Sequence, residues 1–227
     1  MTDAEHGSKR PPRMRRAERD AQRSLITRTR LLEAAAFVLV EHGYAGFNTV
    51  AVCERANAPR GTMLHHFPSR SSLLIASLEH VLERRLERYA EALRDPELTA
   101  ELATPGHRSR RILLDMLWSE FTGPANAAWL ELVVAARTDP ELAAQLREVA
   151  ERFDKSVRTA YVASRAGAPG DGGHSKLAFV FATLNGLALE RAYRSEFDVG
   201  PVLDALARIG EILPPRPSRP PPPTDGA

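Results

Sequence analysis

A group of hydrogen-bond donors at residues 60–66 is the part of the sequence best equipped to bind another molecule. The guanidinium fork of Arg60 matches the edge of guanine or a phosphate, and the hydroxyl of Thr62 can bond to either. Gly61 stands between them, although glycine weakens a helix by about 1 kcal/mol relative to alanine. Such a cost is useful where the backbone must closely approach a ligand. Simple clearance between two helices is the alternative explanation.

Two adjacent histidines follow this group. On a helix, His65 and His66 project about 100° apart, so they are poorly placed to share a metal ion. Contact with a phosphate backbone suits them better, although a plain surface role for one of them is an equal alternative. Arg70 begins the next long helix, where backbone N–H groups and the guanidinium can hold a phosphate. We also count Asn48 and Thr49 among the expected contacts, and we expect no metal ion and no cofactor.

The elements that must position these side chains are two short helices joined by a tight turn. The first covers Thr49–Ala56, with Asn48 as its N-cap. The turn at 57–59 contains Asn57, which tolerates a left-handed conformation. The second helix begins near Pro59 and runs to about Phe67. This arrangement is a helix-turn-helix, whose second helix enters the major groove of DNA with its N-terminal residues facing base edges.

Helical periodicity continues along the chain between its two ends. Leu31, Ala35, Val38 and Leu39 form one apolar stripe, and Gly43 is expected to stop that helix. Glycine and proline mark the later breaks, and no run of residues alternates as a strand would. We therefore expect an all-α fold of about nine helices. The proline-rich segment 214–227 and the basic segment 1–22 are expected to be disordered.

Charge and composition narrow the class of protein. Residues 1–30 hold nine Lys or Arg and four Asp or Glu, whereas the remaining residues carry a slight negative charge. A basic arm of this kind is typical of an end that binds a polyanion, and a solvated tail is the alternative. The longest apolar run, Ala34–Val40, is far shorter than the about 20 residues of a membrane span. With one cysteine and no secretory signal, we expect a cytoplasmic protein.

From about residue 24 to 84 the chain resembles the DNA-binding domain of TetR/AcrR-type transcriptional regulators. The resemblance rests on Gly43-Tyr44 at the end of the first helix, on Arg60-Gly61-Thr62, on His65-His66-Phe67, and on Ser69-Arg70 followed by Leu73-Leu74. It implies a homodimer that reads a pseudo-palindromic operator in double-stranded DNA. It also implies an all-helical C-terminal domain that dimerises and binds a small apolar or amphipathic effector.

Some positions depart from the pattern of this family. Asn57 replaces the usual glycine of the turn, Pro59 replaces a common serine, and Leu64 replaces a tyrosine. The last two changes remove a cap and an expected phosphate contact, and Met63 and Cys53 are milder replacements. The basic arm before residue 24 compensates by adding attraction that does not depend on DNA sequence.

Beyond residue 85 the expected effector site is an aromatic group. Trp118, Phe121 and Trp129 surround the break at Gly123-Pro124, and aromatic side chains between helices are typical of ligand pockets. Plain core packing is the alternative. Glu131, Arg137 and Asn185 are candidates for a polar group that orients the effector.

The expected dimer interface lies on the helix 175–194, which is apolar on nearly every side and must be covered on two faces. We expect Leu177, Phe181, Leu184 and Ala188 at this interface, together with the segment 202–213. A helix buried centrally within one subunit is the alternative.

The sequence thus predicts four parts: a basic arm (1–22), a DNA-binding domain (23–84, with the helix-turn-helix at 48–67), an effector-binding and dimerisation domain (85–213) and a proline-rich tail (214–227). The predicted function is a DNA-binding repressor released by an effector. A regulator of the same fold without a small ligand, controlled by a protein partner or by abundance, is the second possibility. An all-α enzyme is the third, but the sequence holds no metal-ligand spacing, phosphate loop or nucleophile elbow.

Overall fold

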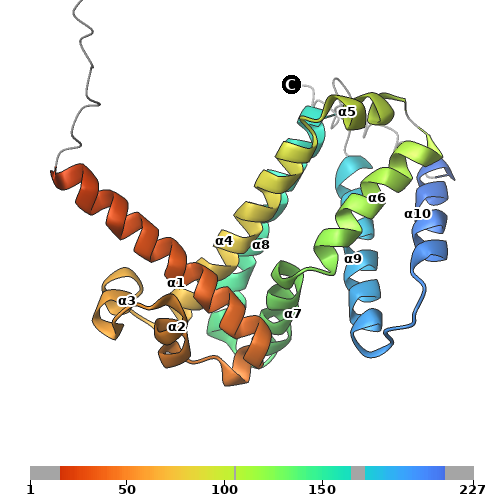
Figure 1. Ribbon diagram of the computed structural model, residues 1–227. Helices are drawn as coiled ribbons and strands as arrows, with labels where there is room; N and C mark the ends of the chain where they lie inside the picture. Colours follow the sequence, from red (N-terminus) through yellow and green to blue (C-terminus); the bar gives the residue numbers. More distant parts are fainter. Residues whose placement is uncertain (1–15, 105, 165–171, 213–227) are drawn as a thin grey trace, which may run out of the picture.

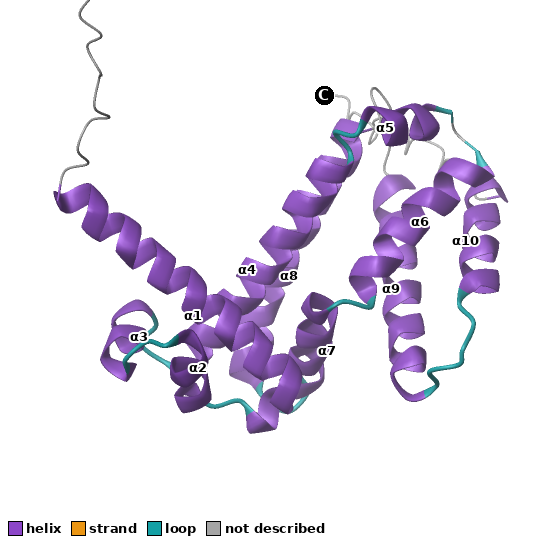
Figure 2. Ribbon diagram, in the orientation of Figure 1, coloured by secondary structure: helices purple, strands orange, loops and turns teal. Residues whose placement is uncertain are grey.

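The computed structural model describes residues 16–104, 106–164 and 172–212, and all its regular elements are helices (Figures 1 and 2). Ten helices follow in order: α1 (Arg16–Gly46), α2 (Thr49–Ala56), α3 (Arg60–His66), α4 (Arg70–Ala92), α5 (Pro96–Ala103), α6 (His107–Phe121), α7 (Pro124–Ala136), α8 (Pro140–Ser164), α9 (Gly172–Tyr193) and α10 (Gly200–Ile212). The expected all-α fold is confirmed, with ten helices in this part of the chain instead of about nine. Of the two expected disordered ends, residues 16–22 form the start of α1, and the others lie outside the described residues.

The predicted apolar stripe and stop of α1 are both present. Leu31, Ala35, Val38 and Leu39 are buried. At Gly43 the backbone adopts φ 66° and ψ 179°, so the regular helix ends there and a short further turn runs to Gly46. Only glycine adopts this conformation readily, because a side chain would clash with the backbone.

Caps and prolines set where the later helices begin. Ser69 accepts a hydrogen bond from the backbone N–H of Ser72, and Ser72 Oγ accepts one from the backbone N–H of Ser69, which makes a capping box at the start of α4. Asp95 caps α5, whose first residue is Pro96. Pro124 likewise opens α7, in a position where its missing N–H costs nothing.

The buried apolar residues form two separate cores. The first combines α1–α4 with α7 and α8, and the second combines α6, α9 and α10. In Figure 1, α6, α9 and α10 lie on the opposite side of α4 and α8 from α3. The expected domain boundary after residue 84 falls inside α4, and the first core continues across it to Leu132 and Leu146. The DNA-binding helices therefore share their core with α7 and α8.

None of the described helices combines the length and the apolar character that a membrane crossing requires.

Candidate nucleic-acid interface

The turn between α2 and α3 has the conformation that the sequence predicts. Asn57 adopts φ 48° and ψ 51°, a left-handed conformation, and its N–H bonds to the end of α2. Asn48 caps the start of α2 by accepting from the backbone N–H of Ala51 at 2.8 Å. Its side chain is thus engaged locally, and the neighbouring Thr49 is half-buried. Pro59 stands at the N-cap of α3 without a side-chain hydrogen bond, as its chemistry requires.

Two apolar anchors fix the orientation of α3. Met63 and Phe67 are buried in the first core, and Arg28 of α1 lies over the Phe67 ring at 5.3 Å. With these anchors inward, α3 presents its other face to solvent. Along it the structure places Arg60, Gly61 and His65 as exposed residues and Thr62 and His66 as half-buried ones.

The environment of Gly61 bears on the packing explanation for this glycine. A Cβ atom built at this position would meet no atom of the chain within 4 Å. Clearance between helices therefore does not require the glycine. Close approach of the backbone to an external partner stays a prediction.

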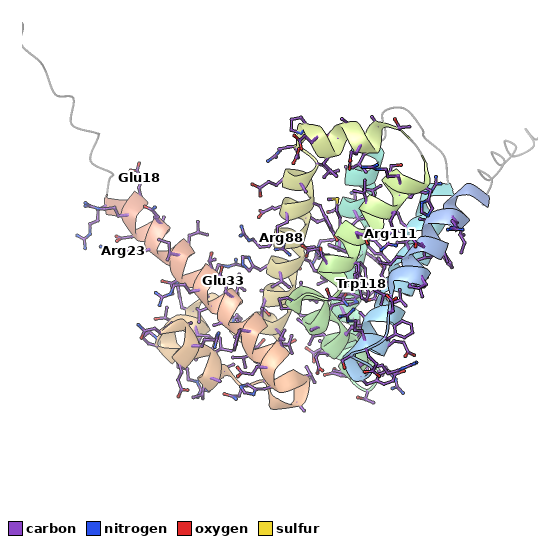
Figure 3. The ribbon with its side chains drawn as sticks, turned by 45° about the vertical axis from the view of Figure 1, so that its right-hand side comes forward. Glu18, Arg23, Glu33, Arg88, Arg111 and Trp118 are labelled. Atoms are coloured by element: carbon purple, nitrogen blue, oxygen red, sulfur yellow. The ribbon has the colours of Figure 1, made fainter. Side chains whose placement is uncertain are left out.

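The charge around α3 is positive, but His66 contributes little of it. Burial, then repulsion from His65 and from Arg28, lowers the pKa of His66 below its usual value. At neutral pH this imidazole is therefore uncharged and acts as a hydrogen-bonding group. Arg28 supplies a permanent charge beside the end of α3, and Arg23, marked in Figure 3, is also exposed on α1.

Arg70 has a different position from the one that a phosphate contact implies. Its guanidinium donates to the carbonyl of Tyr44 at 2.6 Å and to the carbonyl of Phe47 at 3.3 Å. It also lies against the rings of both residues, 4.6 Å and 5.4 Å from the centroids. The side chain is half-buried and ties α4 to the end of α1, so we infer that Arg70 positions the helix-turn-helix.

A junction that sequence reasoning did not find joins α1 to the C-terminal helices. The backbone N–H of Tyr44 donates to Glu131 Oε2 on α7 at 3.1 Å, and the Tyr44 hydroxyl donates to Asp139 Oδ2 at 3.0 Å. Glu131, expected as an effector contact, therefore meets α1 instead. No local pattern signals this junction, because its partners lie 87 and 95 residues from Tyr44.

The three aromatic residues of the expected effector pocket pack on two different cores. Phe121 is buried in the second core, where its ring meets that of Phe181 at 5.4 Å, and Trp118 packs on the same core. Trp129 packs on the first core. Neither of two grooves beside α1 is lined by any of the three. Their packing is that of the core alternative.

The expected dimer face of α9 is largely used within the chain. Leu184 is fully buried against the second core, and Leu177, Phe181 and Ala188 are half-buried. An exposed stripe runs along a different face with spacings of three and four residues. It consists of Phe179, Ala182, Gly186, Leu189 and Tyr193. Because α6 and α10 cover one side of the helix, this second stripe is the one that remains available to a partner.

Comparison with known proteins identifies both halves of the chain. Residues 31–76 match the family described as "Bacterial regulatory proteins, tetR family", and residues 111–212 match "Tetracyclin repressor-like, C-terminal domain". The chain is 31% identical over 178 residues to the "HTH-type transcriptional regulator CymR" of Pseudomonas putida, an alignment that covers 78% of this chain and 84% of that one.

Solved structures share the fold. A TetR-family member from Streptomyces coelicolor superposes with a TM-score of 0.60 at 24% identity, covering 81% of this chain and 97% of that one. The regulator FadR from Bacillus subtilis, solved in complex with stearoyl-CoA, gives a TM-score of 0.57 at 15% identity, covering 80% and 96%. The helix-turn-helix, the all-helical architecture and the relatives agree, and the chain belongs to the tetR family of DNA-binding transcriptional regulators.

Proposed function

We propose that this regulator is a homodimeric repressor that binds a pseudo-palindromic operator and leaves it when a small effector binds. The exposed face of α3 carries the proposal: Arg60, Gly61 and His65 are exposed to solvent, whereas Met63 and Phe67 anchor the helix from behind. Residues 23–84 form the DNA-binding part and residues 85–213 the effector-binding and dimerisation part. A dimer presents α3 twice, with half-sites one helical turn, about 34 Å, apart.

The second subunit docks on the exposed stripe of α9. Phe179 and Leu189 are 47% and 48% exposed, and Tyr193 is 71% exposed, which leaves large apolar groups in water. Ala182 and Gly186 lie between them and allow another helix to approach closely. A symmetric pair of such stripes buries apolar surface on both subunits, the usual driving force of association.

Effector control acts through a population shift. A ligand that binds the geometry unsuited to DNA moves the pair of α3 helices away from the spacing of successive major grooves. Support comes from structural neighbours, since EbrR was solved in complex with proflavin and FadR with stearoyl-CoA. The Tyr44 junction supplies a contact through which the C-terminal helices reach the end of α1.

A genome-wide footprint of the purified protein tests this function. We expect protected sites with two inverted half-sites, and a reporter placed behind such a site should be silenced by the protein. Arg60→Ala should abolish protection. Arg147→Ala, which removes an exposed arginine from α8, serves as the matched control and should leave the sites occupied. Uniform coverage without discrete sites would contradict sequence-specific binding.

A further inference from the structure

An open groove of about 440 Å³ lies between α1, α4 and the start of α7. Its apolar wall includes Phe37 and Val40 on α1, which are 43% and 38% exposed, together with Val81 on α4 and Ala125 on α7. Phe37 and Val40 leave apolar surface in water on this side, and the Arg55 guanidinium lies over the Phe37 ring. The groove therefore suits the apolar body of a small molecule.

The α4 side of the groove carries two arginines, of which Arg84 is 3.2 Å from Glu87. His80, Arg84 and Arg88 line it, and Glu33 on α1 is the acid among the lining residues. Figure 3 marks Glu33 and Arg88 on the two helices that flank the groove. Arg88 is half exposed and donates two hydrogen bonds to Glu120 of α6, at 2.9 Å and 2.6 Å.

Beneath this pair lies a second arginine with an incomplete set of partners. The Arg85 side chain is 4% exposed; its Nε donates to the Tyr89 hydroxyl at 3.4 Å and is 4.0 Å from the same Glu120 carboxylate. Its Nη2 is buried and has no acceptor, and the guanidinium lies over the Phe121 ring at 4.4 Å. Two guanidinium groups thus share one carboxylate. A buried charge with an unmade hydrogen bond is costly, so the cluster is short of one anion.

We propose that this groove binds an amphipathic carboxylate. The carboxylate accepts from Arg88 at the edge of the groove, and the apolar body lies against Phe37 and Val81. Glu120, released from Arg88, then turns to Arg85 and supplies the acceptor that its Nη2 lacks. In the bound state, Arg88 is paired with the ligand carboxylate and Arg85 with Glu120. The inference rests on the proposed function and gives its effector a chemical class.

The position of the groove explains how such a ligand would affect DNA binding. One wall belongs to α1, which carries residues of the first core beside α3, and the other belongs to α4 and α7. A bound molecule contacts both walls at once, so it favours one relative placement of these helices. The groove is not lined by Trp118 or Phe121, which the sequence analysis suggested as part of the effector site.

The test uses octanoate and 3-phenylpropanoate, each against its uncharged amide, with the full-length protein. Calorimetric titration should show binding of the carboxylates and not of the amides, and the carboxylates should raise the melting temperature. Arg88→Met should weaken carboxylate binding by at least about tenfold, the loss expected for a charge-assisted pair. Arg147→Met on α8 is the control and should bind as the parent protein does.

Three results overturn the proposal: no binding of either carboxylate, equal binding of acid and amide, or unchanged affinity in Arg88→Met. The melting temperature of ligand-free Arg88→Met verifies that the variant is folded. DNA binding without ligand is measured separately. If the protein binds an operator and carboxylates do not change that binding, the groove is not the effector site, and the proposed regulator is unaffected. If carboxylates bind but no operator is found, the proposed regulator is refuted and the carboxylate site is unaffected.

Discussion

At Gly61, folding and DNA binding are expected to favour different residues: alanine for the helix and glycine for contact with DNA. A Cβ atom added at Gly61 would contact nothing within the chain, so alanine fits without a clash. Gly61→Ala should therefore raise the free energy of unfolding by up to about 1 kcal/mol, because alanine favours the helix. Operator affinity should fall, because the added methyl group stands between the backbone of α3 and DNA. Urea unfolding and fluorescence anisotropy on an operator duplex measure the two effects, and an alanine variant that binds as tightly as the parent contradicts the assigned role.

Arg60 is exposed at the start of α3, and its substitution distinguishes two kinds of DNA contact. If the guanidinium reads a base, Arg60→Ala should cost about 1–3 kcal/mol on the operator and relax specificity at one position. If it holds a phosphate, affinity should fall evenly on all sequences, and the slope of log affinity against log salt should drop by about 0.9. Titrations on specific and random duplexes at several salt concentrations distinguish a base contact from a phosphate contact. Unchanged affinity and slope exclude both roles.

Residues whose role is local were predictable from the sequence, and those with distant partners were not. Asn48 as a cap and Asn57 in a left-handed turn each depend on a few neighbouring residues, and the structure confirms them. Arg70 depends on carbonyls 23 and 26 residues away. Its type and position favour a phosphate contact equally well, and only the fold shows that its guanidinium is occupied.

At the scale of elements, the end of α1 depends on one unusual backbone conformation. Gly43 adopts a positive φ, and a Cβ atom there would lie 2.9 Å from Glu131 Oε2. Gly43→Ala should therefore lower the free energy of unfolding by about 1–3 kcal/mol, the cost of a residue held in a sparsely populated region. Gly106→Ala is the control, because its extended backbone accepts any residue and its Cβ would meet nothing. Equal stability of the two variants would contradict strain at Gly43.

The same junction should make stability depend on pH through Asp139. Its carboxylate accepts from the backbone N–H of Leu142 and from the Tyr44 hydroxyl, and these bonds hold its pKa below the usual value. The folded pKa is lower than the unfolded one, so the stabilisation is present above about pH 4 and is lost as the pH falls through the folded pKa. The stability advantage of the parent over Asp139→Asn should be full at pH 6–7 and shrink below about pH 4 in urea titrations. Tyr44→Phe should reduce that advantage, and a constant difference at all pH values would contradict the assignment.

At the scale of the whole molecule, the sequence predicts which helices form better than it predicts how they group. Proline and glycine breaks gave the helix boundaries, since these signals are local. The division into two cores depends on which apolar faces meet. Trp118 and Trp129 are eleven positions apart and have similar surroundings in the sequence, yet they pack on different cores. The periodicity of α9 likewise does not predict how this helix packs, because a helix that is apolar all round does not indicate which face its own chain will cover.

The assembly of two subunits can be tested on the face of α9 that the chain leaves open. Leu189 lies in the middle of the stripe formed with Phe179, Gly186 and Tyr193. Leu189→Asp places a charge where the partner helix should pack, and burial of an unpaired charge is strongly unfavourable. We expect this variant to sediment as a monomer and to lose operator binding, while its helical circular dichroism is kept because the side chain is 48% exposed in the subunit. Val134→Asp, at a 58% exposed apolar position on α7, is the control and should stay dimeric. A dimer that survives Leu189→Asp would place the interface on another surface.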